Sequence, residues 1–269
     1  MAASLLVLTD FRQPAARALD YAAALAGVLE APLVVLHVCA PGILDSELLT
    51  APQPRRSPDV AARALACLTE DLPVPAVTEV QQGRVAEAVT GALRQHQPAL
   101  LVLGRPRHEE LPDELATTTA LELLPTTTRP MLVVPEQAVV GLPRRVLLAL
   151  DNEPYELPES ALVVDRLLNP LHARLTVLHV GAGPAEEAAR PAEEAAALLG
   201  LSPELPLKTR TLRHAWPADA ILAAAGSGEF DLVILLARRR SVLGHLFHHS
   251  VTAQVLLHSP VPVLVLPAQ

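Results

Sequence analysis

The sequence predicts an α/β protein with two doubly wound domains, each built on a five-stranded parallel sheet. Three observations support this prediction: short apolar runs, helical patterns between them, and an arrangement that occurs twice along the 269 residues. Runs that are apolar throughout, rather than alternating, are typical of strands buried on both faces of a parallel sheet. A chain of 269 residues also has the length of two domains of ordinary size.

The strand candidates are short runs rich in Leu and Val. In the first half they are Leu5–Leu8, Leu33–Val38, Val77–Val80, Leu100–Leu103 and Met131–Val134. In the second half they are Val146–Leu150, Leu175–Val180, Thr209–Leu212, Leu232–Leu236 and Val261–Leu266. Helical patterns separate them, such as the apolar stripe at Leu19, Ala22, Leu25, Ala26 and Leu29. Strands that alternate with helices in this way form right-handed βαβ units.

The two halves of the chain repeat the same landmarks. Asp10 and Asp151 each follow a first strand and are 141 residues apart. The tripeptide Leu-His-Val ends a second strand at residue 38 and again at residue 180, an offset of 142. Pro130–Pro135 matches Pro262–Pro267 at an offset of 132, which places the longer insertion in the first half, around residues 40–60. We therefore expect one domain at residues 1–138 and a second at 143–269.

Composition excludes several classes of protein. Hydrophobic residues make up 51% of the chain, which is enough to build apolar cores. Aromatic residues make up only 2%, too few for a surface on which the bases of single-stranded nucleic acid could stack. A net charge of −8 argues against binding to nucleic acid or to an anionic membrane. Two cysteines cannot build a disulfide framework. The N-terminus lacks the features of a signal peptide and no apolar run is long enough to span a membrane, so we expect a cytoplasmic protein.

The last strand of each half predicts how the halves meet. Met131–Val134 and Val261–Leu266 would each leave an apolar sheet edge exposed, and such edges are normally paired or covered. We expect the two strands to pair across an approximate two-fold axis, so that the chain forms an intramolecular pseudo-dimer. Association of whole chains into a homodimer stays open.

This order of features resembles the universal stress protein family. The resemblance is carried by Thr9–Phe11 after the first strand, by the repeated Leu-His-Val, and by the paired segments Thr117–Pro135 and His249–Pro267. It covers almost the whole chain, as a tandem of two such domains. It implies a five-stranded parallel sheet with helices on both faces and, as in many members, an ATP site at the carboxyl ends of the strands. It implies no chemical mechanism, because the family shares none.

The family's phosphate motif, G-x2-G-x9-G-[S/T], is degenerate in both halves. Glycines in such a loop let backbone N–H groups approach the phosphates. In the first half the motif maps to Gly104, Arg107, Thr117 and Thr118, where one glycine remains and Arg107 could pair with a phosphate. In the second half it maps to Leu236, Arg239, His249 and Ser250, where no glycine remains and Leu236 would occupy space near the phosphates.

Other positions of the candidate nucleotide site come from the same resemblance. Asp10 and Asp151 match a carboxylate that contacts the nucleoside, Val38 matches a position near the base, and Gly83 matches a loop glycine. Plainer interpretations are a helix cap for the aspartates, core packing for the valine and a turn for the glycine. The candidate ATP or AMP site of the first domain comprises Asp10, Val38, Gly83, Gly104, Arg107, Thr117 and Thr118. The second domain retains Asp151 and Ser250.

A histidine cluster near the C-terminus is a separate candidate. His245, His248 and His249 would share one face of a helix, a spacing that can hold Zn²⁺. The HExxH signature is absent and no acidic ligand lies nearby in the sequence, which favours a solvated or partner-facing polar patch.

Three functional hypotheses follow. The broken glycine motifs favour a non-catalytic stress-response protein with degenerate sites that acts through an unidentified protein partner. The alternative is a regulator that binds ATP or AMP in the first domain only. A slow ATP hydrolase comes last, because no base other than Asp10 is evident and the Walker A, GxGxxG and GxSxG motifs are all missing.

Overall fold

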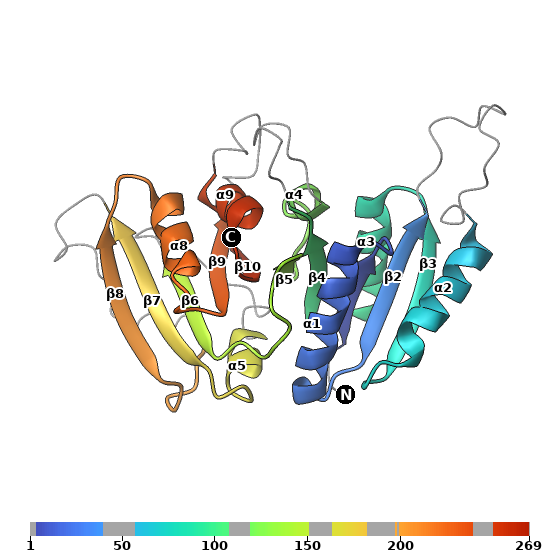
Figure 1. Ribbon diagram of the computed structural model, residues 1–269, viewed down its shortest axis with the longest axis horizontal. Coiled ribbons are helices and arrows are strands. Elements are labelled where there is room, and N and C mark those ends of the chain that lie inside the picture. Colours follow the sequence, from blue (N-terminus) through green and yellow to red (C-terminus); the bar gives the residue numbers. More distant parts are fainter. Residues whose placement is uncertain are drawn as a thin grey trace.

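The computed structural model describes residues 4–39, 57–107, 119–150, 163–181, 197, 199–238 and 250–268. Within them, ten strands form one twisted sheet in the order β3-β2-β1-β4-β5-β10-β9-β6-β7-β8 (Figure 1). The strands are β1 (Leu5–Thr9), β2 (Leu33–Cys39), β3 (Ala76–Gln82), β4 (Leu100–Arg105), β5 (Met131–Pro135), β6 (Arg145–Leu150), β7 (Arg174–Gly181), β8 (Leu207–Arg213), β9 (Leu232–Arg238) and β10 (Val263–Ala268). The helices are α1 (Gln13–Leu29), α2 (Pro58–Glu70), α3 (Val85–His96), α4 (Thr119–Leu123), α5 (Val163–Leu168), α8 (Pro217–Gly226) and α9 (Val251–His258).

All ten predicted strands are present, and the predicted fold class is confirmed. Most strands extend one or two residues beyond the apolar run at one or both ends, because polar residues such as Thr9 and Arg105 continue the ladder. β10 instead begins at Val263, two residues later than expected. Pro262, which precedes it, has no N–H to donate to a ladder.

The two halves have the same topology and meet at their last strands. The first half has the order β3-β2-β1-β4-β5 and the second β8-β7-β6-β9-β10, with parallel pairing inside each half. β5 and β10 pair antiparallel, with Leu132 opposite Leu264. An antiparallel contact between two parallel half-sheets requires an approximate two-fold axis between them. The expected pseudo-dimer is therefore present, and its pairing removes two apolar edges.

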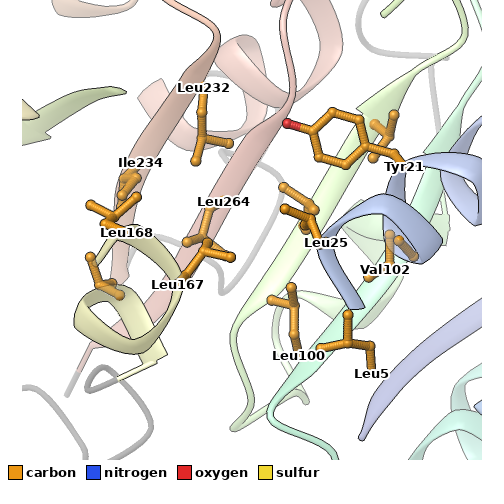
Figure 2. Packing of buried hydrophobic residues seen from close by; sticks show 14 of the residues in the cluster. Leu5, Tyr21, Leu25, Leu100, Val102, Leu167, Leu168, Leu232, Ile234 and Leu264 are labelled. Carbon is orange, nitrogen blue, oxygen red and sulfur yellow. The ribbon is translucent and has the colours of Figure 1, made fainter. Parts of the chain in front are cut away.

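Two apolar cores cover the two faces of the sheet, and each runs through both halves. One core includes side chains of α1, α2 and α5, and the other includes side chains of α3, α4, α8 and α9. Figure 2 shows Tyr21 and Leu25 of α1 on one side of Leu264, with Leu167 of α5 on the other. The halves are thus joined by side-chain packing as well as by the β5–β10 ladder.

Candidate functional site

A cavity of about 270 Å³ lies at the carboxyl ends of β1 and β4. These strands are neighbours in the sheet, but the chain leaves β1 toward β2 on one side and reaches β4 from β3 by crossing to the other. In open α/β sheets, ligands bind at such a switch point. The cavity is lined by Leu8, Thr9, Asp10, Arg12, Pro14, Ala15, Val38, Val85, Leu103, Gly104, Pro106 and Thr119.

The turn between β1 and α1 forms one wall and is fixed by its own side chains. The Thr9 hydroxyl accepts the N–H of Phe11 at 3.1 Å, and the Asp10 carboxylate accepts the N–H of Arg12 at 2.9 Å. Phe11 has a φ of 63°, a left-handed conformation that non-glycine residues adopt only where their surroundings impose it. The Asp10 side chain stays 58% exposed and pairs with the Arg12 guanidinium at 3.5 Å. A carboxylate and a cation are thus presented together at the cavity.

His37 of β2 supports this turn from within the core. Its ring is buried, and Nδ1 lies 2.8 Å from the Thr9 carbonyl oxygen. Because a carbonyl oxygen can only accept, Nδ1 must carry the hydrogen. The Phe11 ring packs on the imidazole with 4.5 Å between centroids. His37 therefore holds the residues on either side of Asp10.

Gly104 has a steric role that the phosphate motif did not predict. A Cβ at this position would lie 2.2 Å from the Pro14 carbonyl oxygen and 2.7 Å from the Ala15 nitrogen. The space next to Gly104 is therefore filled by the first turn of α1. The missing side chain lets this helix approach β4 closely, and the approach shapes one end of the cavity.

The structure brings together some of the predicted first-domain residues. Asp10, Val38 and Gly104 line the cavity. Gly83 lies outside the lining, in the turn between β3 and α3, with a φ of 122° and its N–H donated to the Cys39 carbonyl. Arg107 is exposed and follows the lining residue Pro106. Thr117 and Thr118 lie outside the described residues, and their neighbour Thr119 contributes to the lining.

In the second domain, most of the residues that the sequence singles out lie outside the described residues. They are Asp151, Arg239, His245, His248 and His249. Ser250 caps α9, because its hydroxyl accepts the N–H of Ala253 at 3.1 Å. Leu236 is half-buried and packs against the core on the α1 and α5 face. Among the described residues, no group of three or more His, Cys, Asp or Glu is placed to hold a metal ion.

Sequence reasoning missed several lining residues. Arg12, Pro14 and Ala15 belong to the start of α1, and Val85 belongs to the start of α3. Their position in the sequence could have identified them, since each of these residues follows the carboxyl end of a strand within a few residues. A rule that collected every residue just after a predicted strand would have found them.

Arg105 connects the cavity strand β4 to the second half of the chain. Its side chain is 4% exposed, and its guanidinium donates to the carbonyl oxygens of Leu257 and Ser259. These carbonyls lie at the end of α9, where a helix leaves acceptors unsatisfied and where a cation is favourable. Burial lowers the pKa of Arg105 to about 10, so the guanidinium remains charged at neutral pH.

Within the described residues, no helix is both long enough and apolar enough to cross a membrane. The sequence model of the Universal stress protein family matches residues 1–135 and, a second time, residues 143–267. No curated protein matches the chain.

Several solved structures resemble the whole chain. A universal stress protein from Archaeoglobus fulgidus DSM 4304 superposes with a TM-score of 0.74 at 17% identity, covering 99% of each chain. A functionally unknown protein from Pseudomonas aeruginosa PAO1 superposes with a TM-score of 0.61 at 17% identity, covering 99% of this chain and 92% of the other. At these identities the likeness concerns the fold.

Proposed function

The chain belongs to the universal stress protein family in tandem form, and we propose that it is a regulatory protein that binds an adenine nucleoside or mononucleotide in its first half. The observation that carries this proposal is the cavity at the carboxyl ends of β1 and β4. It gathers Asp10, Val38 and Gly104, three residues that match the family's nucleotide positions. They come from three different strands or strand ends, so only the fold brings them together.

The lining has the chemistry of a nucleoside site. Leu8, Val38, Val85 and Leu103 offer apolar surface for a base. The Asp10 carboxylate can accept hydrogen bonds from sugar hydroxyls or a base amino group, and the Arg12 guanidinium beside it can donate to a phosphate. A volume of about 270 Å³ is close to the lower end of the usual range of small-molecule sites, and the degenerate glycine motif supports a nucleoside or monophosphate over a triphosphate.

The same lining supports binding rather than phosphoryl transfer. Asp10 is the one carboxylate among the described lining residues, and it is already engaged by Arg12. No histidine and no second carboxylate stands among the described lining residues to act as a base or to assist Asp10 in that role. The proposal therefore follows the second of the hypotheses from the sequence, a regulator that binds an adenine nucleotide in its first domain only.

Calorimetric titration with adenosine, AMP and ATP tests the proposal. We expect saturable binding, with AMP or adenosine at least as tight as ATP. Val38→Phe places a ring in the cavity and should weaken binding by about tenfold or more, which corresponds to about 1.4 kcal/mol.

The matched control is Val180→Phe, at the corresponding position of β7 in the second half, where the residue is also half-buried. This variant should bind AMP as the wild type does. Absence of binding for all three compounds would refute the proposal, and so would equal losses in the two variants.

A further inference from the structure

A second cavity, of about 520 Å³, lies at the amino-terminal ends of the second-half strands. Its lining includes Arg145, Arg174, Lys208 and Arg210, on three neighbouring strands. The first-half cavity, by contrast, lies at the carboxyl ends of its strands. Four basic side chains around one cavity stand out in a chain with a net charge of −8 and a single lysine.

The strand register places these cations on one face of the sheet. Arg145 of β6 lies opposite Arg174 of β7, and Thr176, two residues further along β7, lies opposite Lys208 of β8. Arg210 follows Lys208 by two residues. Because side chains alternate along a strand and paired residues of parallel strands point the same way, all four basic residues project from the same face.

Two of the four cations are not neutralised. Arg145 is bound by Asp231, with 2.5 Å between Nη2 and Oδ1, and Arg210 pairs with Glu229 at 3.2 Å. Within the described part of the chain, Arg174 and Lys208 form no ion pair. Both are exposed, so the cavity offers two available positive charges beside two that are already paired.

The first half shows that the fold does not need these cations. Matching the β1–β2–β3 register to the β6–β7–β8 register gives the corresponding residues. For Arg145, Arg174, Lys208 and Arg210 they are Ser4, Pro32, Val77 and Glu79. Charges can also protect a free sheet edge from aggregation. The other edge strand, β3, has no cation at the corresponding positions. Protection of a sheet edge therefore does not explain why all four basic residues are present in the second half.

An apolar side chain lines the cavity on the face of the four cations. It is Phe230, which is 7% exposed and belongs to the core on that face, whereas Leu175 points to the opposite face. A volume of about 520 Å³ lies within the usual range of small-molecule sites. The site therefore combines space for a small carbon skeleton with charges for anionic groups.

We infer that this second-half cavity binds a small organic dianion, either a phosphate monoester or a dicarboxylate, through Arg174 and Lys208. Arg174 suits a planar or tetrahedral oxyanion because its guanidinium can donate two parallel hydrogen bonds, and Lys208 adds a compact charge. The site is separate from the first-half cavity, and its occupation does not depend on adenine nucleotide binding.

Calorimetric titrations with phenyl phosphate and with succinate, at constant ionic strength in chloride buffer, test the inference. We expect saturable binding of at least one probe, and the tighter probe identifies which dianion the site prefers. Lys208→Val and Arg174→Ser should each weaken that binding by about tenfold, the ordinary effect of losing a charged hydrogen-bonding partner. Lys208→Val introduces the residue found at the corresponding position of β3, so the strand should keep its structure.

Arg94→Ser is the charge-matched control, because Arg94 is exposed on α3 in the first half. It should bind the probes as the wild type does, and so should Val38→Phe. The inference is overturned if neither probe binds saturably or if Arg94→Ser weakens binding as much as Lys208→Val. It is also overturned if Val38→Phe abolishes binding while Lys208→Val does not, since the anion would then occupy the first-half cavity.

Discussion

Arg105 and Ser259 belong to different halves of the chain, yet the Arg105 guanidinium donates a 2.5 Å hydrogen bond to the Ser259 carbonyl oxygen. A second hydrogen bond from the same side chain reaches the Leu257 carbonyl. Arg105 follows Gly104 of the first-half cavity, and the two carbonyls lie at the end of α9 in the second half. The strand that carries the candidate site therefore also holds the end of a helix in the other half.

Replacement of Arg105 should destabilise the whole protein. Arg105→Ala leaves two buried carbonyls without donors, so we expect the free energy of unfolding to fall by about 2–4 kcal/mol in urea denaturation. Arg105→Lys can still donate to one carbonyl, so its free energy of unfolding should lie between those of the wild type and Arg105→Ala. Arg94→Ala removes an exposed arginine and should change the value by no more than about 0.5 kcal/mol. Similar losses in Arg105→Ala and Arg94→Ala would show that the contact between the halves contributes nothing.

Addition of one methyl group at Gly104 should also be costly. The new Cβ would overlap the backbone at Pro14, so α1 must move away from β4. We expect Gly104→Ala to lower the free energy of unfolding by about 1–3 kcal/mol, as is usual for overpacking, and to weaken AMP binding. Gly141→Ala is the control, because a Cβ there meets nothing within 4 Å. A Gly104→Ala protein with wild-type stability would mean that α1 is not held against β4.

His37 should affect ligand binding through the turn that contains Asp10. His37→Leu removes the donor to the Thr9 carbonyl, and we expect AMP affinity to fall by about tenfold. His37→Asn places an amide N–H near the position of Nδ1 and should restore most of the affinity. His179→Leu changes the corresponding buried histidine of the second half and should leave AMP binding unchanged. Wild-type affinity in His37→Leu would contradict the positioning role.

Asp231 should make stability depend on pH in the acid range. Burial alone would raise the pKa of its carboxyl, but hydrogen bonds from the Arg145 side chain and from the N–H groups of Arg144 and Arg145 lower it overall. The folded-state pKa therefore lies below the unfolded value, and the carboxylate stabilises the fold above that value. The difference in unfolding free energy between wild type and Asp231→Asn should be largest near neutrality and shrink as the pH falls below about 4. A difference that is independent of pH would contradict this assignment.

The two cysteines should differ sharply in reactivity. Cys39 is buried at the end of β2, and burial raises the pKa of its thiol, whereas Cys67 is exposed on α2. Because the thiolate is the reactive form, a disulfide reagent at about pH 8 should modify Cys67 rapidly and Cys39 slowly. Cys67→Ser should abolish the fast phase, and urea should expose both thiols in the wild type. A fast phase that survives in Cys67→Ser would show that the end of β2 opens readily.

The fold could be predicted from the sequence because its determinants are local and repeated. Strands that are apolar throughout are typical of a parallel sheet covered on both faces, and the repeated landmarks indicated two copies of one topology. Even the antiparallel contact of β5 with β10 followed from two apolar edges that needed covering. The domain limits at residues 1–138 and 143–269 stay a prediction.

The candidate site was predicted only where its residues matched a motif. Asp10 lines the cavity and accepts the N–H of Arg12, but Arg12 and not Asp10 is the N-cap of α1, and the contact of Asp10 with a nucleoside stays a prediction. The steric role of Gly104 depends on how closely a helix approaches a strand, which the sequence does not encode locally. The sequence also does not encode locally which partners the strand side chains find. Glu79 of β3 lies 2.6 Å from His96, whereas Arg210, at the corresponding position of β8, pairs with Glu229.

Equilibrium dialysis with radiolabelled AMP tests the central claim most directly, because it counts occupied sites per chain. We expect one AMP per chain in the wild type and in Val180→Phe, and a much lower occupancy of Val38→Phe at the same AMP concentration, because its affinity is about tenfold lower. Two AMP molecules per chain, none at all, or wild-type occupancy in Val38→Phe would contradict a single nucleotide site at the carboxyl ends of β1 and β4.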